Sequence, residues 1–168
     1  MRTANRVVVG TVLVAVAGWL AGCGGSSSAG TGEPSLVAEG ESSPETAVET
    51  FLFAAKEANE ARAAGQFTVA DRAYEKMAAV FGTENGSIRR SYDASEVRDR
   101  MIVLSACLRP IQFTIISHPD PDAWQRKVTV VTVDLIRDSG RTTLPFNVLV
   151  GRGDRWYIER IDLGEFTC

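Results

Sequence analysis

The stretch RKVTVVTVDLIRDSGRTTLPFNVLVGRGDRWYIERIDL, residues 126–163, decides the fold. Valine and threonine alternate through 126–137, which is typical of a strand with one buried face. Turn-forming residues follow at 138–141, and the chain then runs back through 142–152. Gly153-Asp154 begins a last apolar segment. The stretch therefore predicts three antiparallel strands joined by tight turns.

The side chains of these strands can be assigned to two faces. Two-residue loops at Ser139-Gly140 and Gly153-Asp154 would gather apolar side chains from all three strands on one face. That face would hold Val131, Val133, Leu135, Leu144, Phe146, Val148, Val150, Tyr157, Ile161 and Leu163, and also Glu159 opposite Val148. The opposite face would hold Val130, Leu149, Trp156 and Ile158 at one end and Thr132, Asp134, Asn147, Arg160 and Asp162 at the other.

Three helices are predicted before the sheet. The first covers 44–64, begins after Ser43 as N-cap and stops at a glycine. The second covers about 69–81, and the third covers about 94–109 before a proline. The apolar, β-branched segment 111–117 adds a further strand.

Together these elements predict an α+β fold in which about three N-terminal helices pack on a curved antiparallel meander of about four strands. Residues 43–168 would form this single globular domain, a length of about 126 residues that suffices for one core.

Two segments carry a resemblance to a known family. They are Pro44-Glu45-Thr46-Ala47-Val48-Glu49-Thr50-Phe51-Leu52 with Ala64-Gly65-Gln66, and Trp156-Tyr157-Ile158 in the closing hairpin. Residues 44–168 resemble the nuclear-transport-factor-2-like, cystatin-like fold, although Gln66 replaces the usual aspartate. The resemblance implies a conical cavity between helix and sheet, used by some members as isomerases, dehydratases or cyclases and by many as non-catalytic modules. No catalytic motif of that family maps onto this chain.

The N-terminus has the pattern of an export signal. Arg2 and Arg6 precede an uncharged apolar run, which ends in Leu20-Ala21-Gly22-Cys23. This ending resembles the lipobox of bacterial lipoproteins, which implies cleavage after residue 22 and lipidation of Cys23. The alternative is an uncleaved membrane anchor, but the apolar run is shorter than the roughly 20 residues of a spanning helix.

The predicted mature chain would be tethered to a lipid bilayer through acylated Cys23. Residues 23–42 are rich in glycine, serine and glutamate, so we expect a flexible linker. Gly24 is not aspartate, and by resemblance to the sorting rules of enterobacterial lipoproteins this favours the outer membrane, facing the periplasm, if the organism is Gram-negative. Without Arg2 and Arg6, 16 basic residues oppose 21 acidic ones, a net charge of −5, so no nucleic-acid partner is expected.

Cys107 and Cys168 remain as a candidate disulfide in an oxidising compartment. The alternative is a buried free Cys107 and a frayed Cys168. The single histidine, His118, lies in a turn beside Asp120 and Asp122, which is more typical of a solvated turn than of a catalytic dyad. Arg152-Gly153-Asp154 spells an integrin-recognition tripeptide, but a hairpin turn accounts for it. No metal or cofactor motif is present, so neither is expected.

Two sets of residues could form a ligand site. Glu159 on an apolar face could be a buried general base, with Tyr74 or Tyr157 as proton donor. Its alternatives are a bulge that turns it to solvent or an ion pair with a helix arginine such as Arg100. Asp134, Arg160 and Asp162 could form a polar mouth, or a surface ion-pair cluster.

The leading hypothesis is a membrane-tethered, non-enzymatic module that binds an envelope protein or a small ligand. The alternative is a cavity enzyme of isomerase or dehydratase type, with Glu159 as base.

Overall fold

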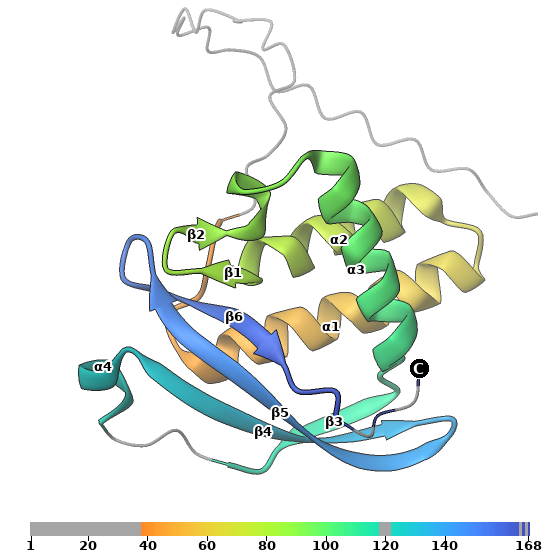
Figure 1. Cartoon of the computed structure of the whole chain (residues 1–168). Helices are drawn as coiled ribbons and strands as arrows, with labels where there is room; N and C mark the ends of the chain where they lie inside the picture. The colour runs from red at the N-terminus through yellow and green to blue at the C-terminus, as the bar shows by residue number, and fades with distance from the viewer. Residues whose placement is uncertain (1–37, 118–121, 165, 167) are drawn as a thin grey trace, which may run out of the picture. The chain divides into compact units, whose positions relative to one another are not determined.

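The computed structural model describes residues 38–117, 122–164, 166 and 168, which fold into an α+β domain (Figure 1). In chain order the elements are α1 (Pro44–Ala63), α2 (Phe67–Val80), β1 (Gly82–Thr83), β2 (Gly86–Ser87), the 3-10 helix η1 (Ile88–Arg90), α3 (Ala94–Leu108), β3 (Gln112–Ile115), α4 (Ala123–Arg126), β4 (Val128–Arg137), β5 (Gly140–Gly151) and β6 (Arg155–Ile161). Strands β3 to β6 form one antiparallel sheet in chain order, which confirms the predicted helices followed by a meander. The sheet is not strongly curved, whereas the sequence analysis expected a curved one.

Helix α1 has the ends that the sequence predicts. The Ser43 hydroxyl accepts a hydrogen bond from the Thr46 backbone N–H at 3.1 Å, and Pro44 occupies the first turn. Gly65 follows the helix with φ +71°, a left-handed conformation that glycine adopts without steric cost. These caps fix the start and end of the helix that covers the sheet.

The core lies between α1 and the sheet. Phe51 of α1 is fully buried, and its ring lies 6.4 Å from the ring of Phe146 on β5 in an edge-on arrangement. The centroid of the Phe81 ring, just after α2, lies 5.8 Å from that of Phe51. Helix α2 packs beside α1, so the helical layer meets the sheet mainly through α1.

The β4–β5 hairpin turns one residue earlier than expected. Arg137 pairs with Gly140, so the loop is Asp138-Ser139. This moves each pairing by two residues, and because side chains alternate with a period of two, every residue keeps its predicted face. Val131, Val133, Leu135, Leu144, Phe146 and Val148 are all buried in the core.

The predicted register of β6 is wrong. Gly151 pairs with Arg155, so the loop has three residues, with positive φ at Gly153 (73°) and Asp154 (53°). The extra loop residue turns the first half of β6 over, and Trp156 and Ile158 enter the core in place of Tyr157. A bulge at Glu159 then restores the predicted face, because Phe146 pairs with Ile161.

Residues 38–42, which the sequence analysis assigned to the flexible linker, belong to the folded domain. Glu41 bonds to Trp156 in both directions, N–H to O at 3.0 and 2.8 Å, and thereby lies along the edge of β6. Gly40 is buried, and its N–H donates to the Ala79 carbonyl at 2.9 Å. The outer edge of β6 is thus covered by the chain itself.

Candidate functional site

The candidate acid–base residues of the alternative enzyme hypothesis do not come together. Glu159 is the extra residue of the β6 bulge, and its side chain is exposed rather than buried on the apolar face. Tyr74 lies on α2 within the core, whereas Tyr157 faces the other side of the sheet. The bulge that turns Glu159 to solvent was one of the two alternatives to a buried base. Glu159 therefore gives no support to a cavity enzyme.

Tyr157 is held by two glycines. A Cβ atom on Gly40 would lie 2.7 Å from Cζ of the Tyr157 ring, and one on Gly151 would lie 2.9 Å from the same ring. The hydroxyl donates to the Arg152 carbonyl at 3.4 Å. Burial raises the pKa of Tyr157, and the nearby Glu39 carboxylate adds to the effect. These contacts give Tyr157 a structural role in fastening residues 38–42 to the sheet.

Tyr74 is a buried tyrosine whose hydroxyl has no hydrogen-bond partner among the described residues. A buried hydroxyl without a partner destabilises the folded state by about 1–3 kcal/mol. Phenylalanine has the same ring without that group.

Tyr74→Phe is therefore expected to leave the free energy of unfolding unchanged or to raise it by about 1 kcal/mol, because no hydrogen bond is lost. Tyr74→Ala serves as the matched control and should lower it by about 3–5 kcal/mol, since it empties an aromatic site. Urea unfolding measures both. A Tyr74→Phe protein that loses more than about 1.5 kcal/mol would show that the hydroxyl has a partner.

The candidate polar mouth of Asp134, Arg160 and Asp162 is also not formed. Asp134 instead binds Arg141 through two contacts of 2.8 and 2.7 Å to Nε, and this guanidinium lowers the pKa of the carboxyl group. Asp134 lies opposite Thr143, whereas Arg160 lies opposite Asn147, further along β5. Asp162 accepts a hydrogen bond from the Gly164 N–H at 3.2 Å. Asp134 is thus one half of a surface ion pair, with a partner the sequence analysis did not select.

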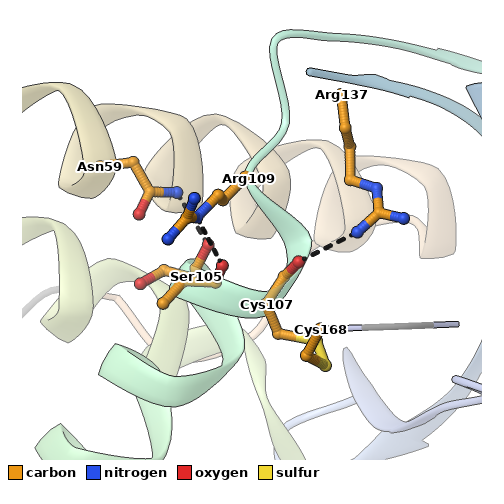
Figure 2. Close-up of a disulfide and its surroundings, with 7 residues drawn as sticks. Asn59, Ser105, Cys107, Arg109, Arg137 and Cys168 are labelled. Carbon is orange, nitrogen blue, oxygen red and sulfur yellow. Dashed lines mark hydrogen bonds between the residues drawn. A yellow bond between two sulfur atoms is a disulfide. The ribbon is translucent and has the colours of Figure 1, made fainter. Parts of the chain in front are cut away.

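The structure joins Cys107 and Cys168 by a disulfide, with Cα atoms 4.5 Å apart (Figure 2). Cys107 lies in the last turn of α3, where side chains from α1 and β4 donate hydrogen bonds to backbone carbonyl groups. Asn59 Nδ2 donates to the Ser105 carbonyl at 2.8 Å, and Arg137 Nη1 donates to the Cys107 carbonyl at 3.4 Å. The bridge therefore ties the C-terminal tail to a helix end that α1 and β4 also hold.

A polar basin of about 900 Å³ lies beside this disulfide. The end of α3, the β4–β5 turn and the tail after β6 form its walls, and its charged lining residues are Arg109, Arg137, Arg141, Asp138 and Asp162. Arg137 also lies 3.8 Å from the Phe166 ring centroid, which fixes the tail. Three arginines and two aspartates therefore mix the two signs of charge in this lining.

A second concavity, of about 650 Å³, runs along α3. Its apolar lining comes from Phe81, Ile88, Met101, Val103 and Leu104, and its charged rim is Glu96, Asp99 and Arg100. We call it the α3 groove. Its volume lies within the range of about 300–1,000 Å³ for small-molecule sites, and apolar walls with a few polar groups are typical of them. This groove was not predicted, because it forms only when Phe81 and Ile88 come to lie beside α3 in the folded chain.

Three of the residues selected from the sequence lie outside the described part of the chain, and the findings on metal sites and membrane spans concern the described part alone. Cys23, His118 and Asp120 are outside the described residues. Within the described ranges, no cluster of histidine, cysteine, aspartate and glutamate is suited to a metal ion. No helix in the described part of the chain has the length and hydropathy of a membrane span.

Comparison of the chain with protein-family models, characterised proteins and solved structures gives no match.

Proposed function

We propose that the chain is an exported lipoprotein, held in the cell envelope by acyl chains on Cys23, whose folded domain is a non-enzymatic binding module. The observation that carries the proposal is the sequence Leu20-Ala21-Gly22-Cys23 directly after an uncharged apolar run. Stable anchoring needs more than one acyl chain, because a single chain binds membranes only marginally. If the organism is Gram-negative, the proposed site is the periplasmic face of the outer membrane.

The Cys107–Cys168 disulfide supports export. Disulfides persist in oxidising compartments and are rare in the cytosol, where thiols are kept reduced. Cys107 is 6% exposed, and its partner Cys168 lies on the tail that follows β6. A disulfide at this position stabilises the domain only in a compartment that keeps it oxidised, which supports a location outside the cytosol.

Two features of the domain support binding rather than catalysis. Glu159, Tyr74 and Tyr157, the candidate acid–base residues, point to solvent, to the core and to the outer side of the sheet. Catalysis needs such groups within hydrogen-bond reach of one another or of a shared substrate. The α3 groove, by contrast, has the size and apolar lining of a ligand site.

Replacing Cys23 tests the proposal. Cys23→Ser should abolish labelling by an alkyne analogue of palmitate and leave the unmodified precursor, because serine offers no thiol for acylation. Labelled cells are fractionated, and the label is measured per mole of protein.

The matched control is the double variant Cys107→Ser/Cys168→Ser, which keeps Cys23 and should keep the label. Label that persists on Cys23→Ser, or label that is lost only from the double variant, would contradict lipidation at Cys23.

A further inference from the structure

We infer that β3 is an interface at which two copies of this chain pair edge to edge. The four-stranded sheet has two edge strands, β3 and β6, and they differ in whether another segment pairs with them. The β6 edge is covered, since Glu41 pairs with Trp156 and Phe81 bridges to Ile158. Along β3, no strand of the described chain pairs with the side away from β4.

The open side of β3 presents backbone groups ready to bond. The Ile116 N–H donates to the Thr132 carbonyl at 3.0 Å, which fixes which residues of the ladder bond to β4. In an antiparallel ladder these residues alternate, so Thr114 and Gln112 also face β4. The N–H and C=O groups of Phe113 and Ile115 therefore point to the open side.

The sequence of this edge lacks the usual protection against pairing. Natural edge strands carry charges, prolines or bulges that prevent association with another strand. Residues 111–117, IQFTIIS, contain no charged residue, no proline and no glycine. A second copy would meet no like charge along this segment. Neutrality and high β propensity make the edge compatible with its own copy.

Exposed apolar side chains flank the edge. Phe53 of α1 is 61% exposed, and its ring packs edge-on against Phe113 with centroids 4.8 Å apart. Ile111 and Ile116, at the two ends of the segment, are 46% and 54% exposed. Pairing would cover these groups and contribute the hydrophobic stabilisation that a backbone ladder alone lacks.

The geometry selects one register, centred on Thr114. Phe113, whose backbone groups point to the open edge, would then pair with Ile115 of the second copy. Ile115 would pair with Phe113 of that copy, and the two pairs together would form about four backbone hydrogen bonds. The twofold axis passes between the two Thr114 residues and stands perpendicular to the sheet, so the helices of both copies lie on the same side. The product is one continuous antiparallel sheet with a self-complementary, closed interface.

Engineered cysteines test this register in the full chain carrying Cys23→Ser, so that the only other cysteines are the bridged pair. Thr114→Cys should form a disulfide-linked dimer under mild oxidation, because Cα atoms of a non-hydrogen-bonded cross-strand pair lie about 4.5 Å apart. Gln112→Cys is the matched control on the same strand and should stay monomeric, since its partner in this register is Ile116. The double variant Gln112→Cys/Ile116→Cys should cross-link again. Non-reducing electrophoresis with mass spectrometry identifies each product.

A charge at the axis gives an independent readout. Thr114→Lys should convert the dimer to monomer in sedimentation velocity, whereas Thr143→Lys, on an exposed site of β5, should leave it dimeric. Three results would overturn the inference. They are a monomeric parent chain, equal cross-linking of Thr114→Cys and Gln112→Cys, and a disulfide from Thr114→Cys to a different protein. None depends on lipidation, so this test and that of the proposed function can fail separately.

Discussion

Removing the Cys107–Cys168 bridge is expected to lower the free energy of unfolding by about 4 kcal/mol. The two cysteines are 61 residues apart in the sequence, and a cross-link of that span restricts the unfolded chain by about this amount in the chain-entropy model. The loss is large beside the 5–15 kcal/mol typical of whole domains. The tail that forms one wall of the polar basin should detach first. It is held by the disulfide at Cys168 and by the contact of Phe166 with Arg137, and the variant keeps only the second.

The measurement is urea unfolding of wild type and Cys107→Ala/Cys168→Ser, each with and without reductant. Reductant should destabilise wild type by about 4 kcal/mol and leave the double variant unchanged. This comparison separates the bridge from the small packing cost at Cys107, which is present in both redox states of the variant. A wild-type midpoint that does not respond to complete reduction would show that the bridge contributes nothing to stability.

Phe146→Ala is expected to lower the free energy of unfolding by about 3–5 kcal/mol, the usual cost of emptying a buried phenylalanine site. Phe146 is 0% exposed and sits at the centre of the core, where it pairs with Val131 on one side and Ile161 on the other. The Phe146→Ala variant also loses the edge-on contact with the ring of Phe51 on α1, the helix through which the helical layer mainly meets the sheet.

The matched control is Thr143→Ala on the same strand. Thr143 is exposed on the outer face, so its replacement should change stability by no more than about 0.5 kcal/mol. Both are measured from urea midpoints at equal protein concentration. Equal losses for the two variants would mean that the assignment of β5 residues to the inner and outer faces is incorrect.

The helices and the inner faces of β4 and β5 could be predicted because their signals are local. Ser43, Pro44 and Gly65 mark the ends of α1 by backbone chemistry that needs no tertiary contact. The apolar alternation of β4 and β5 survives even a misplaced turn, because a shift by two residues leaves each side chain on its face.

The orientation of β6 could not be predicted, because it depends on the length of one loop. Trp156-Tyr157-Ile158 is apolar at three consecutive positions, so either face assignment buries large side chains. The loop takes three residues, with Gly153 and Asp154 both in left-handed conformations, and its length is not visible in composition. The predicted role of Glu159 depended on this register and was lost with it.

The packing of residues 38–42 on the domain also could not be predicted from the sequence. Their composition is that of a linker, yet Gly40 fits where any side chain would collide with Arg155 and Tyr157. Such a close approach is specified by residues more than a hundred positions away. The α3 groove differs, because all of its lining residues lie within 81–104, and it depends on how this stretch folds back on itself.

The most direct test of an exported, lipid-anchored, disulfide-closed domain is the intact mass of the protein extracted from membranes and alkylated without reductant. The predicted species begins at Cys23, carries the mass of several acyl chains and takes up no alkylating agent at Cys107 or Cys168. A species that begins at Met1 without acyl mass, or one alkylated at either of these two cysteines, would contradict the account.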